Sequence, residues 1–307
     1  MELLYFLEGL RTPLGDAFFS LVTHLGEETL FIVAGLLVFW CIDKWEGYYL
    51  LSVGLTGTVI NQFLKLWFRI PRPWVKDPDF TIVESARAEA TGYSFPSGHT
   101  QSAVGVFGSA ARWNRQKAVR LICILLCVLV PLSRMYLGVH TPADVGVSVL
   151  VALALLFGIY PVIRKSVNDP KAMRLLLAGM VALAAGYLAF VTLYPFPADV
   201  EVTNLSHGTK NAYTMLGCTL GLLVASIVDQ KWLHFDNKAP LLGQIGKLAV
   251  GAGLALAIKA VLKTPLLALF GGHTSATALR YFLVVVFAGV LWPLSFPLWA
   301  KLGKKKA

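Results

Sequence analysis

The sequence predicts an all-α, polytopic membrane helix bundle. Its 307 residues are 56% hydrophobic and only 14% charged, whereas a soluble domain averages about 45–50% apolar and about 25% charged residues. Long apolar segments recur along the chain between short polar loops. This composition argues against a soluble globular enzyme, a disordered chain and a disulfide scaffold. It also argues against a nucleic-acid partner despite the net charge of +10, because membrane topology accounts for the excess of Lys and Arg.

A helix that spans a membrane needs roughly 20 mainly apolar residues. Residues 2–22 are apolar but contain Arg11, Pro13 and Asp16, so we expect one or two short amphipathic helices at the membrane surface. The start lacks the basic region of a signal peptide. The segments that predict about nine spans are 27–43, 47–69, 97–113, 117–136, 142–163, 173–194, 211–229, 240–263 and 276–300.

Basic residues in alternate loops predict the orientation of these spans. They are Arg112, Arg115, Lys117, Arg120, Arg164, Lys165, Lys171, Arg174, Lys231, Lys238 and the tail Lys301, Lys304, Lys305 and Lys306. By the positive-inside rule these loops and the C-terminus are cytoplasmic. The loops 70–96, 134–141, 195–210 and 264–275 are then extracytoplasmic. The length and the lack of a signal peptide favour a bacterial inner membrane.

The first polar cluster ends the second predicted span, on the extracytoplasmic side. Lys65 and Arg72 are seven residues apart, which puts them near one helix face if the helix continues that far. Pro71 and Pro73 then end the helix. Two such cations can hold an anion with several oxygens. The alternative is a pair of cations that extend to the membrane interface.

The second cluster, Pro96-Ser97-Gly98-His99, opens the third predicted span. Free N–H groups and the helix dipole at such a start favour an anion. Gly98 permits close approach of the backbone to a ligand, and His99 can exchange a proton near neutral pH. An ordinary capped helix start is the alternative.

The third cluster joins the fourth and fifth spans. Asp144 lies four residues after His140, so a helix that starts near Thr141 lets the carboxylate reach the imidazole. A carboxylate on one ring nitrogen makes the other a better nucleophile. Arg134 adds a third cation. The alternative is a short turn with a capping Asp.

Neither a metal nor a cofactor is expected, because the acidic residues are few and dispersed. We interpret the four cysteines as small buried hydrophobic residues; they are Cys41, Cys123, Cys127 and Cys218. Together the three polar clusters are typical of phosphoryl transfer through a phospho-histidine.

These segments resemble the three signature motifs of the type-2 phosphatidic acid phosphatase superfamily. The motifs read Lys, six residues, Arg-Pro; then Pro-Ser-Gly-His; then Ser-Arg, five residues, His, three residues, Asp. The matching residues are Lys65 with Arg72-Pro73, then Pro96-Ser97-Gly98-His99, then Ser133-Arg134 with His140 and Asp144. The resemblance covers about residues 27–163 directly and implies a six-helix core that the sixth span completes.

The resemblance implies a role for each matched residue. His140 attacks the phosphorus, Asp144 orients His140, and His99 protonates the leaving oxygen and then helps to activate water. The resemblance also implies a covalent phospho-enzyme and an extracytoplasmic site. The residues that it implies for holding the phosphoryl oxygens are Lys65, Arg72, Ser97, Gly98 and Arg134.

Three C-terminal spans are added to this core. The expected divisions are therefore 1–26 as an interfacial segment, 27–195 as the phosphatase core and 196–307 as a three-helix extension. The nine spans are similar in number to those of glucose-6-phosphatase and sphingosine-1-phosphate phosphatase. Gly217 and Gly221, four residues apart, predict close helix packing.

Several basic residues lie in or beside the last three spans, and two interpretations are open. They extend to the interface or bond neighbouring helices, which we favour, or they form a second site for an anion or a lipid headgroup. They are Lys247, Lys259, Lys263, His273 and Arg280.

The leading hypothesis is a membrane phosphatase whose partners are the bilayer and a lipid phosphate or diphosphate. A polyprenyl diphosphate is narrowly preferred over phosphatidic acid, phosphatidylglycerophosphate and a sphingoid phosphate. The alternatives are a lipid phosphotransferase, a sugar-phosphate phosphatase, and a transporter or lipid-binding protein on a phosphatase scaffold. Intact His99, His140 and Asp144 argue against the last of these. The oligomeric state is left open.

Overall fold

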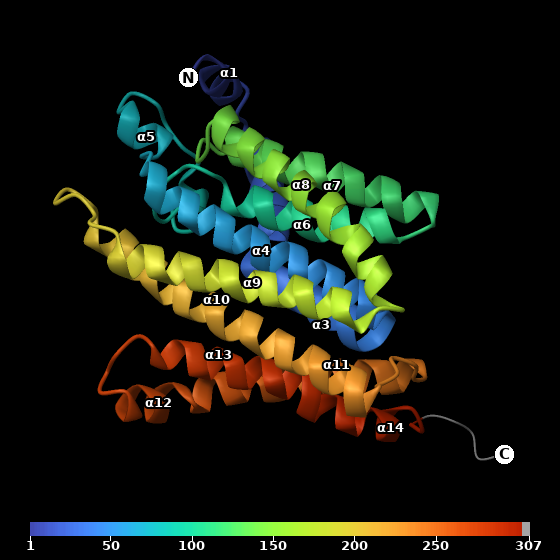
Figure 1. The fold of residues 1–307 in the computed structure, drawn as a ribbon. Coiled ribbons are helices and arrows are strands. Elements are labelled where there is room, and N and C mark those ends of the chain that lie inside the picture. The colour runs from blue at the N-terminus through green and yellow to red at the C-terminus, as the bar shows by residue number, and fades with distance from the viewer. Residues whose placement is uncertain (303–307) are drawn as a thin grey trace. The chain divides into compact units, whose positions relative to one another are not determined.

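The computed structural model describes residues 1–302, and over that range the chain consists of helices and loops without strands (Figure 1). The all-α prediction is confirmed. The first α-helices are α1 (Glu2–Gly9), α2 (Pro13–Thr23), α3 (Glu28–Leu37), α4 (Lys44–Phe68), α5 (Pro73–Lys76), α6 (Gly98–Trp113) and α7 (Lys117–Tyr136). The later ones are α8 (Pro142–Ser166), α9 (Pro170–Leu193), α10 (Val202–Val228), α11 (Leu241–Val261), α12 (Lys263–Leu269), α13 (Ala276–Val286) and α14 (Phe296–Trp299).

Short turns of other helical types extend or join these helices. They are η1 (His24–Gly26), η2 (Val38–Ile42), η3 (Glu84–Ala86), η4 (Asp229–Leu233), η5 (Phe287–Leu291) and η6 (Trp292–Ser295). The predicted basic tail at Lys304, Lys305 and Lys306 lies outside the described residues.

Six helices in residues 1–302 are long and apolar enough to cross a membrane. A seventh span exists if Pro13–Gly26 and Glu28–Ile42, which meet at a bend of 52°, count as one. The predicted number of nine is therefore not confirmed, although the chain is an integral membrane protein. The six are α7, α8, α9, Val202–Leu233, Leu241–Leu269 and Ala276–Trp299.

Three predicted spans are absent from these six: 27–43 counts only within the bent pair, and the other two differ for a physical reason. The segment 97–113 forms α6, whose 16 residues fall short of the roughly 20 that a span needs. The segment 47–69 lies in α4, which has 25 residues but is interrupted by polar side chains such as Asn61 and Lys65. Both helices carry site residues, and a polar site lowers the hydropathy on which span prediction depends.

The chain divides into two compact units. Unit 1 contains Met1–Ile32, Thr56–Gly158 and Phe196–Gly208; unit 2 contains Val33–Leu55, Ile159–Pro195 and the described residues from Thr209 onward. All eight predicted site residues belong to unit 1. The predicted boundaries at residues 26 and 195 stay predictions.

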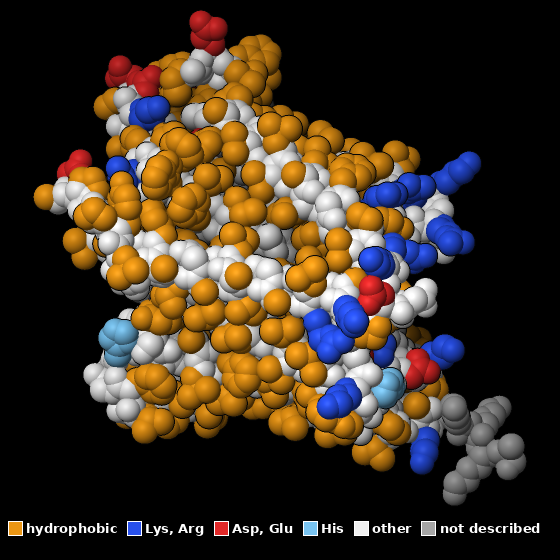
Figure 2. Space-filling model, in the orientation of Figure 1, with side chains coloured by type: hydrophobic (Ala, Val, Ile, Leu, Met, Phe, Trp, Pro, Cys, Tyr) orange, Lys and Arg blue, Asp and Glu red, His pale blue; other side chains and the backbone are white. Residues whose placement is uncertain are grey.

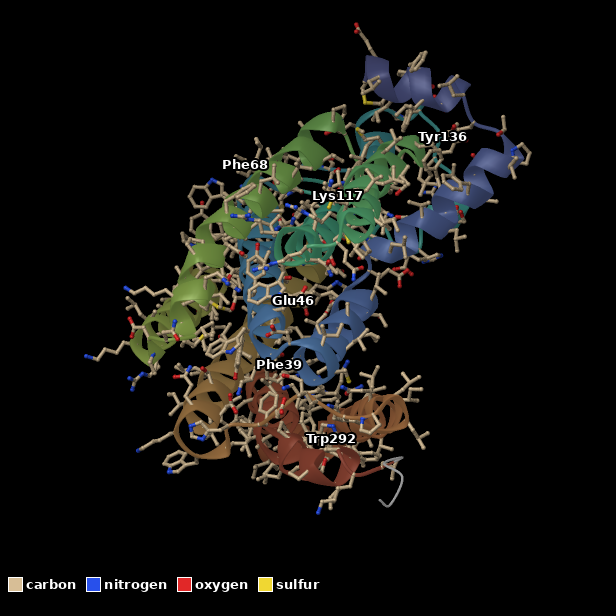
Figure 3. The ribbon with its side chains drawn as sticks, turned by 90° about the vertical axis from the view of Figure 1, so that its right-hand side faces the viewer. Phe39, Glu46, Phe68, Lys117, Tyr136 and Trp292 are labelled. Carbon is tan, nitrogen blue, oxygen red and sulfur yellow. The ribbon has the colours of Figure 1, made fainter. Side chains whose placement is uncertain are left out.

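In unit 1, α6 packs along α7, and α2 and η1 pack against this pair. Val22, Ala103 and Val130 bring α2, α6 and α7 together in a buried cluster. The last residue of α7, Tyr136, lies beside the N-terminal helices (Figure 3). Its ring centroid is 4.2 Å from that of Phe19, and its hydroxyl donates to Asp16 Oδ1 at 3.0 Å. These contacts fix the end of α7, where the third motif begins.

The N-terminal residues also hold the long loop that follows α4. Arg11 Nε donates to the Tyr136 carbonyl, and Arg11 Nη1 donates to the Thr81 carbonyl, each at 3.0 Å. The Thr81 N–H donates to Glu8 Oε1 at 2.9 Å. The predicted short helices of residues 2–22 are thus present as α1 and α2, and they are bound to two parts of unit 1 that lead into the site.

In unit 2, α10 packs closely on α13 through the two glycines predicted to allow this. A Cβ added to Gly217 would come within 2.2 Å of the Ala278 carbonyl oxygen, and one added to Gly221 within 2.7 Å of Val285. Lys247 is fully buried and its Nζ donates to the Asn237 carbonyl at 2.8 Å. This lysine therefore bonds a neighbouring segment and does not extend to the interface.

The outer surface of the helices is apolar, as a membrane environment requires. Along α7 five hydrophobic side chains are each more than half exposed: Leu121, Ile122, Ile124, Leu125 and Val128. Figure 2 shows hydrophobic side chains over α7 and α8 and a group of Lys and Arg side chains where α6 meets α7. That group contains the exposed Arg112, Arg115, Lys117 and Arg120.

Candidate active site

The first motif is held by a turn and not by one helix face. Because α4 ends at Phe68 and Arg69 has a left-handed φ of 51°, the helix does not continue to Arg72. The prediction that Lys65 and Arg72 share a helix face is therefore wrong. They are instead joined through one loop: Lys65 Nζ donates to the Tyr93 carbonyl at 2.5 Å, and Arg72 Nη2 donates to the Thr91 carbonyl at 2.7 Å.

Arg72 connects the loop before the second motif with the third motif. Only 6% of it is exposed, and its Nη1 donates to the Val139 carbonyl and to His140 Nε2, both at 2.9 Å. Burial lowers the pKa of Arg72 to about 10, an effect that Asp144 opposes, so the guanidinium stays charged at neutral pH. This arginine thus carries a positive charge to the ring nitrogen that faces away from Asp144.

The second motif begins α6, as predicted. Ser97 is its N-cap and accepts a hydrogen bond from the Thr100 N–H at 3.4 Å. The Ser97 N–H donates to the Asp144 carbonyl at 3.1 Å, which joins the second motif to the third. A Cβ added to Gly98 would meet only Asn61 Oδ1, at 3.9 Å, so the space beside this backbone is open. His99 Nε2 is buried and has no hydrogen-bond partner among residues 1–302.

The third motif pairs His140 with Asp144 at the start of α8. His140 Nδ1 lies 3.4 Å from Asp144 Oδ2, and His140 Nε2 lies 2.9 Å from Arg72 Nη1. Since a guanidinium can only donate, Nε2 must accept and the ring proton belongs on Nδ1, toward the carboxylate. The imidazole is therefore held in the tautomer whose free lone pair is on Nε2.

Burial lowers the pKa of His140 well below its usual value, and the charges of Arg72, Arg134 and Lys65 lower it further. The imidazole is consequently neutral at neutral pH. Asp144 Oδ2 is fixed from two other directions, by the Ser94 hydroxyl at 2.5 Å and by the Thr141 N–H at 2.7 Å. A neutral ring beside a fixed carboxylate is the arrangement that an activated histidine nucleophile requires.

Arg134 is completely buried near the end of α7. Its Nη1 donates to Thr23 Oγ1 at 2.6 Å, and its carbonyl accepts from the His140 N–H at 3.2 Å. Its Nε and Nη2 are buried without a hydrogen-bond partner in residues 1–302. Such unpaired donors are costly, and a phosphoryl group offers the oxygens that they lack.

Unit 1 thus brings the eight predicted residues into one constellation, and it adds residues that sequence reasoning missed. Ser94 supports Asp144, and Thr23 supports Arg134. Ser148 donates to the carbonyls of Ser97 and Asp144, each at 2.9 Å. Ser94 lies only three residues before Ser97, so a hydroxyl so near the second motif was a usable signal; Thr23 and Ser148 offered none.

Two family models match parts of the chain. The model of the PAP2 superfamily matches residues 45–168, a range that contains all eight predicted site residues. The model of the PAP2 superfamily phosphatase transmembrane extension matches residues 213–305. No solved structure matches the chain.

Three curated relatives are similar over different parts of the chain. Phosphatidylglycerophosphatase B of Bacillus subtilis is 30% identical over 161 residues, which are 48% of this chain and 75% of the relative. A probable sphingosine-1-phosphate phosphatase of Dictyostelium discoideum is 26% identical over 251 residues, 78% of this chain and 58% of the relative. Undecaprenyl-diphosphatase BcrC of Bacillus subtilis is 35% identical over 104 residues, 34% of this chain and 51% of the relative.

The second and third alignments span only about half the length of those relatives, whereas the first covers three quarters of its relative. The two family models together include both the site and the C-terminal helices. The chain belongs to the PAP2 superfamily and is a membrane phosphatase of that family.

Proposed function

We propose that this phosphatase hydrolyses a lipid phosphate or diphosphate through a phospho-histidine on His140. The observation that carries the proposal is the pair of contacts on one ring, Asp144 at Nδ1 and Arg72 at Nε2. Arg72 Nη1 donates to the lone pair of Nε2. A phosphoryl group that binds to Arg72 with its oxygens puts phosphorus next to that lone pair.

The reaction then has two steps. The Nε2 lone pair attacks phosphorus, the bond from phosphorus to the leaving oxygen breaks, and His99 gives that oxygen a proton. In the second step His99 takes a proton from water as the water oxygen attacks phosphorus. The N–P bond breaks, phosphate leaves and His140 is restored. Asp144 balances the positive charge of the phosphorylated imidazole.

The cations have a separate role in this scheme. The phosphoryl oxygens are bound by the charges of Lys65 and Arg72 and by the Arg134 Nε and Nη2 donors, which have no hydrogen-bond partner within residues 1–302. The Ser97 hydroxyl and the Gly98 N–H add donors at the start of α6. Charge that develops on these oxygens in the transition state is thereby stabilised by groups that are already in position.

The membrane setting supports a lipid as the substrate. The site residues lie at helix ends, where a headgroup can enter while its tails stay in the bilayer. The named activities of the relatives concern lipid phosphates and a polyprenyl diphosphate. We place a polyprenyl diphosphate first, with phosphatidylglycerophosphate and a sphingoid phosphate as the nearest competitors. By the positive-inside rule, the basic residues between α6 and α7 belong to a cytoplasmic loop. Since the site residues lie at the start of α6 and near the end of α7, this supports a site on the extracytoplasmic side.

Phosphate release from a panel of lipids by purified protein in micelles tests this function. The panel contains undecaprenyl diphosphate, phosphatidylglycerophosphate, phosphatidic acid, sphingosine-1-phosphate and glucose-6-phosphate. We expect turnover of at least one lipid and slow turnover of the sugar phosphate. Preferred turnover of glucose-6-phosphate would contradict the lipid assignment. Transfer of labelled phosphate to an added lipid alcohol, with none released to water, would identify a phosphotransferase.

His99→Ala is expected to slow the enzyme selectively, because its proposed task is to protonate the leaving oxygen. A lipid phosphate should react about 10²–10⁴-fold more slowly, the usual contribution of a general acid. The first turnover of para-nitrophenyl phosphate, whose leaving oxygen is weakly basic, should be nearly unchanged. A rapid-mixing measurement of nitrophenolate release provides the comparison, with the exposed His207→Ala as the control. Equal losses on both substrates would remove His99 from the role of acid.

A further inference from the structure

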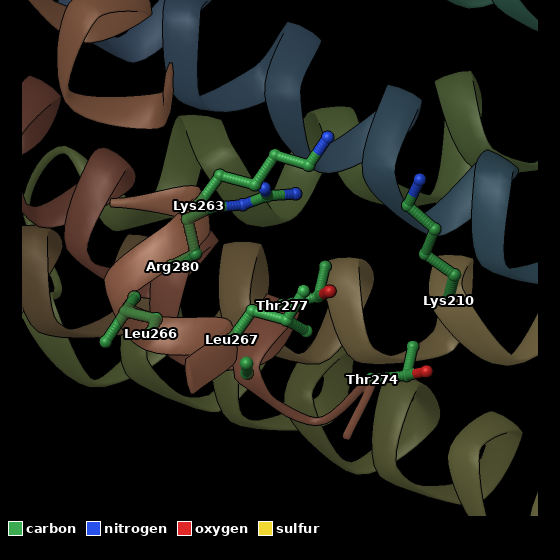
Figure 4. A pocket seen from close by; sticks show the side chains of 8 residues that line it. Lys210, Lys263, Leu266, Leu267, Thr274, Thr277 and Arg280 are labelled. Atoms are coloured by element: carbon green, nitrogen blue, oxygen red, sulfur yellow. The ribbon is translucent and has the colours of Figure 1, made fainter. Parts of the chain in front are cut away.

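A second cationic pocket lies in unit 2, in the C-terminal helices. Its volume is about 190 Å³, and it is formed by the start of α10, the region around α12 and the start of α13. Lys210, Lys263 and Arg280 line it together with Thr274 and Thr277. Figure 4 shows Lys263 and Arg280 on one side of this space and Lys210 across from them. None of these residues belongs to the proposed catalytic constellation.

The charge of this pocket is not balanced by the protein. Lys210, Lys263 and Arg280 form no ion pair within residues 1–302. From Thr209 to the end of the sequence the only acidic residues are Asp229 and Asp236. Asp229 is already paired with Lys44, its Oδ2 lying 2.8 Å from Lys44 Nζ. Three like charges around one small space repel one another unless an anion lies between them.

Arg280 points most directly to a ligand. Only 9% of it is exposed, and its Nε is buried without a hydrogen-bond partner in the described part of the chain. The guanidinium contacts the ring of Tyr281, 5.2 Å from its centroid, but a ring face does not satisfy an N–H donor as an oxygen does. A buried arginine with an unused donor, inside a pocket that contains two lysines, is arranged to bind an oxyanion.

The other residues that line the pocket indicate which kind of molecule carries that oxyanion. Thr274 and Thr277 provide hydroxyl donors, whereas Leu266 and Leu267 provide an apolar wall. The volume of about 190 Å³ is smaller than the roughly 300–1,000 Å³ of pockets that enclose drug-sized ligands. It therefore suits a phosphate group whose organic part continues outside the pocket, along the exposed apolar side chains of α12 such as Leu269.

We propose that this pocket is a second, non-catalytic site that binds a phosphate group, and that an anionic membrane lipid supplies it. Basic pockets between membrane helices are suited to such headgroups. A bound phosphate would join three helices by neutralising Lys210 of α10, Lys263 of α12 and Arg280 of α13. It would also stabilise the folded chain, because any ligand that binds only the folded state does so.

Binding is measured directly on the purified full-length protein, so that the result does not depend on turnover. Native mass spectrometry counts the lipids retained from micelles that contain either phosphatidylglycerol or phosphatidylcholine. Phosphatidylglycerol is anionic but has no terminal phosphoryl group, so it is a poor ligand for the proposed catalytic site. Thermal unfolding is followed in parallel with phosphatidylglycerol, with phosphatidylcholine and with inorganic phosphate alone.

The wild-type protein should retain phosphatidylglycerol in preference to phosphatidylcholine and should unfold at a higher temperature with it. Lys263→Gln and Arg280→Gln should each weaken this retention at least about fivefold and remove the thermal shift. Lys238→Gln, which removes one exposed positive charge from the same unit, is the matched control and should behave as wild type. Lys210 and Lys263 are exposed, so their Gln variants keep the test available if Arg280→Gln does not fold.

Two results would overturn the lipid assignment in different ways. Unchanged retention in both Lys263→Gln and Arg280→Gln would show that the pocket is not the binding site. A thermal shift with inorganic phosphate but none with phosphatidylglycerol, lost in the same variants, would assign the pocket to free phosphate. Because none of these measurements uses hydrolysis, failure of the proposed catalytic function would leave them interpretable.

Discussion

His140→Ala is expected to abolish turnover while the fold is kept. The Nε2 atom is the only proposed nucleophile, and removal of a nucleophile from a covalent mechanism lowers turnover by roughly 10⁴-fold or more. The same change should abolish transfer of label from a phosphate-labelled substrate to the protein, measured after the reaction is stopped without acid. Turnover is measured as phosphate release in micelles, and folding by circular dichroism and a single peak in gel filtration.

The control for this result is His207→Ala, which removes an exposed histidine of unit 1. It should leave both turnover and labelling near the wild-type level. Turnover within tenfold of wild type in His140→Ala would refute the nucleophile assignment. Lost turnover with retained labelling would place the phosphorylated residue elsewhere.

Asp144→Asn should produce the second-largest loss, about 10²–10⁴-fold in turnover, as for a carboxylate that supports a reacting histidine. The amide is nearly the same size and can still accept hydrogen bonds from Ser94 and Thr141, which now meet at Oδ2. The negative charge that balances the phosphorylated ring is lost, however. The expected signature is a large fall in kcat with a small change in KM, because the charge matters after substrate binds.

Glu84→Gln is the matched control, since Glu84 is an exposed carboxylate of unit 1 that accepts hydrogen bonds from the exposed Arg87. It should change kcat by no more than about twofold, as expected for a surface substitution away from the reaction. If Asp144→Asn raised KM alone, the carboxylate would act in binding and not in catalysis.

The sequence predicted the class of fold, whereas its count of nine spans is not confirmed at helices whose polar side chains lower their hydropathy. The six helices that pass as spans are those whose surfaces are mostly apolar. Of the three predicted spans outside these six, α4 and α6 carry Lys65 and the Ser97–His99 segment. Neighbouring helices can shield the polar side chains of such a helix from lipid. The hydropathy of a single segment contains no information about this shielding.

The site was predicted more fully than the helices that hold it. Motif spacing identified the eight residues, and the pairing of His140 with Asp144 followed from their separation of four. The helix-face argument for Lys65 and Arg72 failed because Arg69 ends α4 with a left-handed φ of 51°. Carbonyl groups of one loop accept hydrogen bonds from both cations. Because every residue has a backbone carbonyl, the residue types in that loop do not reveal such bonds.

Contacts across long sequence separations were beyond prediction for the same reason. Thr23 bonds Arg134 over 111 positions, and nothing in either local sequence relates the two. Arg280, whose buried Nε has no hydrogen-bond partner within residues 1–302, was equally invisible, since we favoured the view that the basic residues of the last spans extend to the interface or bond neighbouring helices. Only the burial of an arginine and its hydrogen-bond partners in the folded structure show whether its guanidinium reaches water.

The bonds from Thr23 to Arg134 and from Arg11 to the Tyr136 carbonyl have a practical consequence. Both partners on the N-terminal side lie before residue 45, where the match to the family begins. A chimera that transplants residues 45–168 into a relative would carry every proposed site residue and still lack two of the hydrogen-bonded supports around them. A transplant that keeps these two supports must therefore include Arg11 and Thr23 in addition to residues 45–168.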